Sequence, residues 1–335
     1  MTALRPTAGP AAGTALAVLS ACAFGTVGTA TKVLSAAGLS AMEIAQARLT
    51  IAALLLLAYT AVTRPSQLRA TRRQWSVIAA LGLFSFAALQ TLCGVAVARI
   101  PVGVFVVLQF LSPVVVLVWL RWVRRVRQQR LAWAGVAVVV AGLLLVGEVW
   151  SRLRLDAVGV VAGLGTAAAL SVRFLLAGRA LEHRDPVAVT ALGIALGALA
   201  LDVLAPPTGF PYAALARSVH YGQVSAPVWA VVLWAGIVAT LLAYLSGIAA
   251  QRLLAPSTAS LLATLEVVTG AGVAFVFLGE RLTAVQCTGV VTVLAGVLIA
   301  RRAMRTQTAP ARTLAGRDGA TPVRGEPVPQ NPGGN

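Results

Sequence analysis

The sequence predicts an all-α integral membrane protein with ten transmembrane helices, arranged as two inverted five-helix repeats. Of its 335 residues, 59% are hydrophobic and only 11% are charged, whereas soluble domains carry roughly a quarter charged residues. Apolar runs of about 20 residues, long enough to cross a bilayer, recur ten times along the chain. A set of residues also recurs at an offset of 154 positions. The composition excludes an ordinary soluble enzyme.

The ten spans follow each other with short connections. Four prolines, Pro101, Pro186, Pro227 and Pro256, lie at or near the first turn of a span, where the missing N–H group costs little. The apolar runs predict spans at 12–34, 41–62, 75–98, 101–120, 131–148, 155–176, 186–206, 226–250, 255–278 and 283–300.

The spans divide the chain into a short N-terminus (1–11), a first repeat (12–148), a second repeat (155–300) and a tail (303–335). The tail is rich in Pro, Gly, Arg and Thr, which predicts disorder. In the first span, Leu19-Ser20-Ala21-Cys22 resembles a lipoprotein cleavage box. The apolar stretch around it is longer than a secretory signal, so we interpret it as the first transmembrane helix.

Positive charges predict that both termini are cytoplasmic. Nineteen Arg side chains fall in the segments that lie inside in this orientation, and six Lys or Arg fall in the outer segments. Cytoplasmic loops carry such an excess, so the charges mark membrane topology rather than a nucleic-acid-binding face. The remaining two, Arg48 and Arg173, lie within spans. Three cysteines in apolar runs, without close pairing, predict neither a disulfide framework nor a metal site.

Residues 98–146 match residues 252–300 at the offset of 154. Leu108 falls on Leu262, and other matches are Leu111 with Leu265, Arg127 with Arg281, Gly135 with Gly289 and Gly142 with Gly296. Five spans per repeat are an odd number, so the second repeat must insert in the opposite orientation. Inverted repeats are the architecture of many transporters that work by alternating access.

The run Phe277–Gln286, followed by Gly289 and Gly296, resembles the end of an EamA domain. These domains belong to the drug/metabolite transporter superfamily, and the resemblance covers about residues 12–300. It implies a ten-helix permease of the inner (plasma) membrane. The segments similar to the threonine/homoserine exporter branch are Ala47–Leu49, Ile100–Gly103, Leu108–Phe110, Ser112–Val114 and Leu265-Glu266.

Three departures separate the chain from these patterns. Gln109 stands where the threonine/homoserine exporter branch carries a glutamate. Val267 follows Glu266 at a position where that branch often has a proline. The first repeat has Arg124-Arg125-Val126 in place of the Leu-Gly-Glu motif, which the second repeat has at 278–280.

Glu266 is the strongest candidate for a functional residue. It is the only one of ten acidic residues near the middle of a span, and a carboxylate there costs roughly 2.5–3.5 kcal/mol on insertion scales. A proton-coupling site or a contact to a substrate ammonium would explain it. The structural alternative is that Glu266 is hydrogen-bonded to a second helix and only holds the two helices together.

Other polar residues within spans are weaker candidates. Arg48 suits a substrate carboxylate, and its alternatives are snorkelling to the outer interface or pairing with Glu266. Gln90, Gln109 and Tyr244 either bind substrate or bridge helices, and Gln90 matches Tyr244 at the offset of 154. We interpret Arg173, near the predicted end of its span, as a snorkelling side chain.

Several further residues have structural interpretations. Gly159 with Gly163, and Gly193 with Gly197, have the spacing of close helix packing. We expect Glu280 to cap the last helix. Three tryptophans lie near predicted membrane interfaces and are expected to belong to the aromatic belt there: Trp119, Trp122 and Trp150.

The leading hypothesis is a secondary transporter that exports an amino acid or similar small polar metabolite in exchange for protons. Efflux of drugs or cationic compounds is the alternative on the same fold, followed by a channel or an integral-membrane enzyme. The chain lacks a Walker-type loop and any HExxH or paired-carboxylate motif, so we expect no ATP hydrolysis, catalytic residue, metal or cofactor. The expected partners are a small-molecule substrate and lipid, with a homodimer left open.

Overall fold

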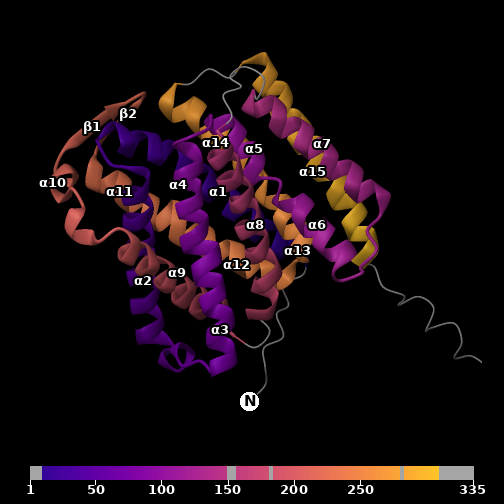
Figure 1. Cartoon of the computed structure of the whole chain (residues 1–335), viewed down its shortest axis with the longest axis horizontal. Helices are drawn as coiled ribbons and strands as arrows, with labels where there is room; N and C mark the ends of the chain where they lie inside the picture. Colours follow the sequence, from indigo (N-terminus) through magenta and orange to yellow (C-terminus); the bar gives the residue numbers. More distant parts are fainter. Residues whose placement is uncertain (1–9, 149–155, 181–183, 280–282, 309–335) are drawn as a thin grey trace, which may run out of the picture.

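A computed structural model describes residues 10–148, 156–180, 184–279 and 283–308 (Figure 1). Ten segments within these ranges are helical, long enough and apolar enough to cross a membrane, which confirms the predicted fold class. The first five spans are α1 (Pro10–Ala36), α2 (Ala41–Thr63), α3–η2–α4 (Arg72–Ala80, Leu81–Ala88, Leu89–Val97), α5–α6 (Val102–Gln109, Ser112–Trp122) and α7 (Arg130–Gly147).

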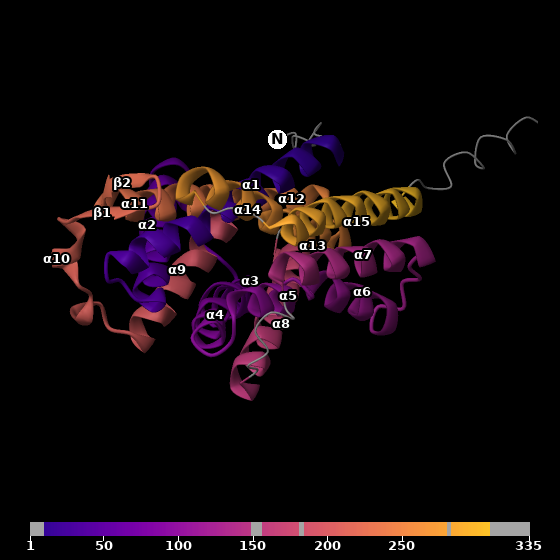
Figure 2. The same cartoon turned by 90° about the horizontal axis from the view of Figure 1, so that it is seen from above.

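The other five spans are α8 (Ala157–Ala180), α9 (Pro186–Leu204), α11–η5–α12 (Val228–Gly236, Ile237–Leu242, Ala243–Leu253), α13–α14 (Pro256–Ala263, Leu265–Leu278) and α15 (Ala284–Thr308). Two short 3-10 turns, η1 (Pro65–Leu68) and η4 (Pro207–Gly209), lie in connections. Figures 1 and 2 both place α7 and α15 at one end of the molecule, and α2 and α10 (Tyr212–Leu215) at the other.

Polar side chains fix where several helices begin. Ser40 and Glu43 form a reciprocal capping box at the start of α2, and Thr71 does the same with Gln74 at the start of α3. The carboxylate of Asp185 accepts from the Val187 N–H group, with Pro186 at the first helical position of α9. Each cap satisfies backbone donors that a helix leaves unpaired at its N-terminus.

The two repeats share the same irregularities of the backbone. The third and eighth spans each contain a π-helical segment, η2 and η5, and each returns to an α-helix at residues 154 positions apart, Leu89 and Ala243. In η5 the Thr240 hydroxyl donates to the carbonyl of Ala235, five residues earlier. The fourth and ninth spans are both broken near their middle, at 110–111 and at Thr264.

The contact between α7 and α15 shows that the repeats are inverted. A Cβ atom built on Gly142 would lie 2.9 Å from the carbonyl oxygen of Gly289. A Cβ atom built on Gly289 would likewise lie 2.9 Å from the carbonyl oxygen of Gly142. A Cβ on Gly296 would lie 2.8 Å from the carbonyl oxygen of Gly135. Because the pairs run in opposite order along the two helices, equivalent helices of the repeats are antiparallel.

The other two glycine pairs also lie at close helix contacts. A Cβ on Gly159 would meet Ile100 at 2.7 Å, and one on Gly163 would meet Leu108 at 2.8 Å. Gly193 packs against the ring of Phe86, and Gly197 packs against its Cβ atom. Their predicted role in packing is confirmed.

The connection before the eighth span contains a β-hairpin that we did not predict. Strands β1 (Ser218–Tyr221) and β2 (Val224–Pro227) pair antiparallel, and Gly222 in the turn has a positive φ of 62°. The Gln223 N–H group donates to the Phe277 carbonyl oxygen at 2.9 Å. The hairpin therefore covers the C-terminal end of α14.

The last helix is longer than expected. We predicted a disordered tail from residue 303, but α15 continues to Thr308, because Ala303 and Met304 are buried in a hydrophobic cluster with residues of α1 and α13. Arg301 donates to the Thr14 hydroxyl at 2.8 Å, so the start of α1 and the end of α15 lie together. The predictions for Trp150, Glu280 and residues 309–335 concern positions outside the described residues.

Candidate functional site

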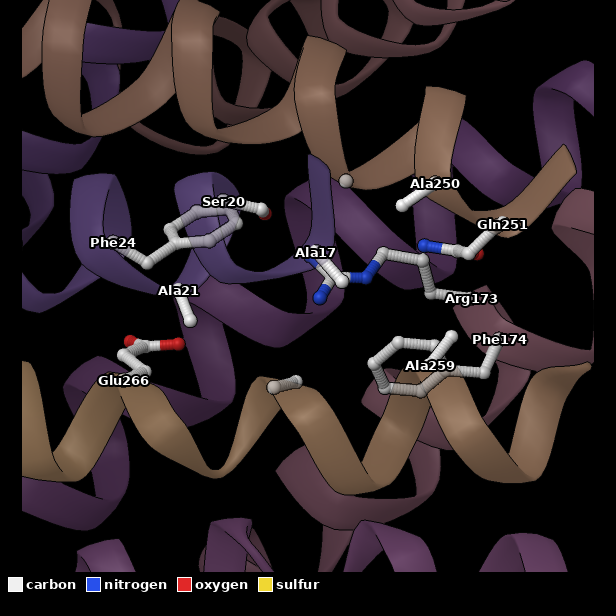
Figure 3. Close-up of a pocket in the computed structure, with 12 residues that line it drawn as sticks. Ala17, Ser20, Ala21, Phe24, Arg173, Phe174, Ala250, Gln251, Ala259 and Glu266 are labelled. Carbon is white, nitrogen blue, oxygen red and sulfur yellow. The ribbon is translucent and has the colours of Figure 1, made fainter. Parts of the chain in front are cut away.

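A small cavity lies between five helices next to Glu266 (Figure 3). The centre of a water molecule can move within about 20 Å³ of it, which is room for little more than one water. Its lining residues come from α1, α8, α12, α13 and α14: Ala17, Ser20, Ala21, Phe24, Arg173, Phe174, Gly247, Ala250, Gln251, Ala259, Ala263 and Glu266.

Glu266 is the second residue of α14, directly after the break in the ninth span. The break at Thr264 is stabilised locally, because its hydroxyl donates to the Leu261 carbonyl oxygen at 2.7 Å. The half-buried carboxylate faces the cavity in Figure 3. The break therefore places both a carboxylate and the N-terminus of a half-helix in the interior of the bundle.

Arg173 also lines the cavity, which corrects our interpretation of it as a snorkelling side chain. The helix α8 continues to Ala180 rather than ending near 176, so Arg173 lies two turns from its end. Only 7% of the residue is exposed. Its guanidinium carbon lies 5.1–5.5 Å from the ring centroids of Phe24, Phe174 and Tyr244, and aromatic faces attract such a cation.

Tyr244 supports this arrangement from the eighth span. The residue follows η5 and is buried, and its ring makes edge contacts with Phe24 and Phe86 at 4.7 and 4.6 Å. The equivalent residue of the first repeat is Gln90, the second residue of α4. Gln90 is buried and its amide nitrogen has no hydrogen-bond partner.

Arg48 lies in α2 with 7% of its surface exposed. Its Nε and Nη1 atoms are buried without a hydrogen-bond partner. The guanidinium group interacts electrostatically with Glu266, Tyr244 and Cys93. Among the described residues no carboxylate oxygen lies within 4.0 Å of it, so Arg48 is buried and interacts with Glu266 without forming a salt bridge. Its role in binding a substrate carboxylate stays a prediction.

Two glutamines differ in their relation to the cavity. Gln109 is the half-buried last residue of α5, beside the break in the fourth span, and it does not belong to the lining residues of this cavity. Gln251, which we did not predict, does line the cavity, and its buried Oε1 atom has no partner. It falls just past the predicted end of the eighth span, where composition alone suggested a loop.

On the hairpin side of Glu266, α1 and α14 are in close contact. The Thr269 hydroxyl donates to the Ala21 carbonyl oxygen at 3.0 Å. Gly25 packs against Thr269 and Gly270, and a Cβ on Gly25 would lie 2.9 Å from the Gly270 nitrogen. This contact closes the site toward the hairpin.

Glu266, Arg173 and Gln251 line the cavity. The buried side chains of Arg48 and Tyr244 are not among its lining residues but interact electrostatically with Glu266. Such a set can bind a carboxylate through the guanidinium groups and an ammonium group through Glu266. Within the described ranges, no three His, Cys, Asp or Glu residues lie close enough together to hold a metal ion.

Comparison with known proteins identifies the family. A model of the EamA-like transporter family matches residues 11–147 and again residues 157–302. A solved structure described as "Crystal structure of protein" is 17% identical, with a TM-score of 0.70, and the match covers 89% of this chain and 99% of that one. This likeness shows a shared fold. A search of curated proteins found no match.

The two family matches together cover most of the chain, one in each half, as the duplicated architecture of the family requires. They establish a multi-pass membrane transporter of the drug/metabolite superfamily, whose partners are a small-molecule substrate and membrane lipid. The narrower likeness to the threonine/homoserine exporter branch stays a prediction. The chain belongs to the EamA-like transporter family.

Proposed function

We propose that the protein exports an amino acid or a similar small polar metabolite in exchange for protons. It would do so by alternating access, in the plasma membrane and with both termini in the cytoplasm. The orientation rests on the excess of arginine in the inner segments. We expect no enzymatic reaction.

The position of Glu266 is the observation that carries this proposal. A carboxylate at the break of a spanning helix, facing an internal cavity, is costly to insert and is explained by function. In transporters with inverted repeats, discontinuous helices form the binding site near the middle of the membrane. A carboxylate there can take up and release a proton during the cycle.

The packing of α1 supports a cycle in which the two ends of the site open in turn. The helix contacts α14 tightly through Gly25 on the hairpin side, and its earlier residues, from Ala17 to Phe24, line the cavity. The cavity has room for about one water molecule, so a metabolite enters only when these helices move apart.

The test is Glu266→Gln, which keeps the size and hydrogen bonding of the side chain but removes its ionisation. Glu43→Gln is the matched control, because Glu43 lies in the first turn of α2 and its role is to cap that helix. Both purified variants are reconstituted in proteoliposomes. Flux driven by a pH gradient and exchange of substrate at equal pH are then measured.

We expect Glu266→Gln to lose flux driven by the pH gradient while exchange at equal pH continues, and Glu43→Gln to behave as the wild type. Loss of both activities, with weaker binding, would instead assign Glu266 to the substrate ammonium group. Near-normal proton-driven flux in folded Glu266→Gln protein would contradict both roles. The carboxylate would then have only a structural role, as a contact between helices.

A further inference from the structure

Two buried guanidinium groups act on the half-buried carboxylate of Glu266 in the site. The groups that interact electrostatically with Glu266 are those of Arg173 and Arg48, and each arginine is only 7% exposed. With Glu266 ionised, the site carries one net positive charge inside the bundle. We propose that this site selects small carboxylates of net negative charge, and that amino acids with two carboxylates and one ammonium group are its best charge complement.

This inference rests on the proposed function, because it concerns the substrate of the same site. Its first support is that neither cation forms a salt bridge within the described residues. Neither guanidinium lies within 4.0 Å of a carboxylate oxygen of any described residue. Arg48 leaves Nε and Nη1 without hydrogen bonds, and Arg173 leaves Nε. A buried cation without a partner is strongly destabilising, so a ligand that supplies the missing carboxylate gains that energy.

The surroundings of Arg173 indicate that it is held in place for a ligand. Three aromatic rings lie 5.1–5.5 Å from its guanidinium carbon. Ring faces attract the cation but provide weak acceptors for its N–H groups. The group is therefore fixed next to the cavity, as Figure 3 shows, and its buried Nε atom is left without a hydrogen bond.

Charge then discriminates between the candidate substrates. A lysine-like cation would be repelled by the net positive site, and so would a cationic drug. A neutral amino acid would satisfy one guanidinium and Glu266 but leave the second guanidinium unpaired. An amino acid with two carboxylates would pair one with Arg48 and the other with Arg173, while its ammonium group meets Glu266.

The experiment is counterflow of labelled L-glutamate into proteoliposomes that contain the purified protein. The competitors are unlabelled L-aspartate, lactate, L-threonine, L-lysine and ethidium. We expect aspartate to compete best, lactate and threonine less, and lysine and ethidium hardly at all. Absence of glutamate counterflow, or stronger competition by lysine or ethidium than by aspartate, would overturn the proposal.

Variants test the role of the two arginines directly. Arg48→Gln and Arg173→Gln should each raise the glutamate concentration for half-maximal counterflow about tenfold or more, and threonine competition should change less. Arg48→Lys and Arg173→Lys keep the charge if the glutamine variants do not fold. Unchanged preference for glutamate over threonine in all folded variants would contradict the inference.

Arg184→Gln is the matched control. Arg184 is also 7% exposed, but it donates to the Arg69 carbonyl and the Gln74 side chain, away from the cavity, so its loss should leave the substrate preference unchanged. The inference and the proposed function can fail separately. Glutamate counterflow without any response to a pH gradient would refute proton coupling alone. Proton-driven flux of threonine or lysine without glutamate counterflow would refute only the inference.

Discussion

Replacing Gly25 by alanine tests whether the contact between α1 and α14 closes the candidate site. The added Cβ would lie 2.8 Å from the Thr269 Cβ and 2.9 Å from the Gly270 nitrogen, and in hard contact with the Thr269 hydroxyl. Ordinary contacts of a Cβ begin near 3.4 Å. The two helices would therefore have to move apart by about 0.5 Å, and Thr269 would have to leave its hydrogen bond to Ala21.

The expected destabilisation combines two effects. Overpacking of a tight contact costs about 1–3 kcal/mol, and loss of the hydrogen bond costs about 1 kcal/mol. Together they should lower the midpoint of thermal unfolding by roughly 5 °C. Counterflow should fall as well, because Thr269 lies one turn beyond Glu266 on the same helix.

The control is Gly28→Ala, three residues further along α1, where a Cβ would meet nothing within 4 Å. Alanine is the better helix former, so this variant should be as stable as the wild type or slightly more stable. Adding Thr269→Ala to Gly25→Ala should cost less than the sum of the single changes, because it removes part of the clash. Equal stability and equal counterflow of the Gly25→Ala and Gly28→Ala variants would refute the reasoning.

Two further predictions concern the repeat and its orientation. Gly142→Ala and Gly296→Ala, at equivalent positions of the two repeats, create nearly the same contacts between α7 and α15: 2.6 and 2.8 Å to the nitrogen and Cγ2 of a valine, and 2.9 or 2.8 Å to a glycine carbonyl oxygen. Each should therefore lower the stability by about 1–3 kcal/mol; thermal unfolding in which only one of the two variants is destabilised would contradict the symmetry. A reporter that works only in the cytoplasm should be active when fused after Thr308 and silent when inserted in 207–225; the reverse result would overturn the orientation.

The membrane spans could be predicted from the sequence because apolar length and loop charge are additive properties of the chain. The helix breaks could not be predicted in the same way. Thr264 interrupts the ninth span with neither proline nor glycine at that position, and the π-helical segments leave no trace in composition. They depend on how neighbouring helices pack, which a single sequence does not show.

Arg173 shows why the candidate site was predicted only in part. Its distance from the end of α8 was underestimated, and its aromatic neighbours Phe24 and Tyr244 come from the first and eighth spans. Glu266 was easier to find, because a single carboxylate within an apolar run is unusual wherever it points. The hairpin was missed because strands of four residues within a polar loop carry little periodicity.

The asymmetry of the charges within a symmetric scaffold bears on the proposed proton coupling. The position equivalent to Glu266 in the first repeat is Ser112, the first residue of α6 after the matching break. In alternating access the two repeats exchange conformations between the two states. Carboxylates at both positions would then give the site the same total proton affinity in either state. With a carboxylate in one repeat only, the surroundings of that carboxylate differ between the states, and such a difference is what coupling to a proton gradient requires.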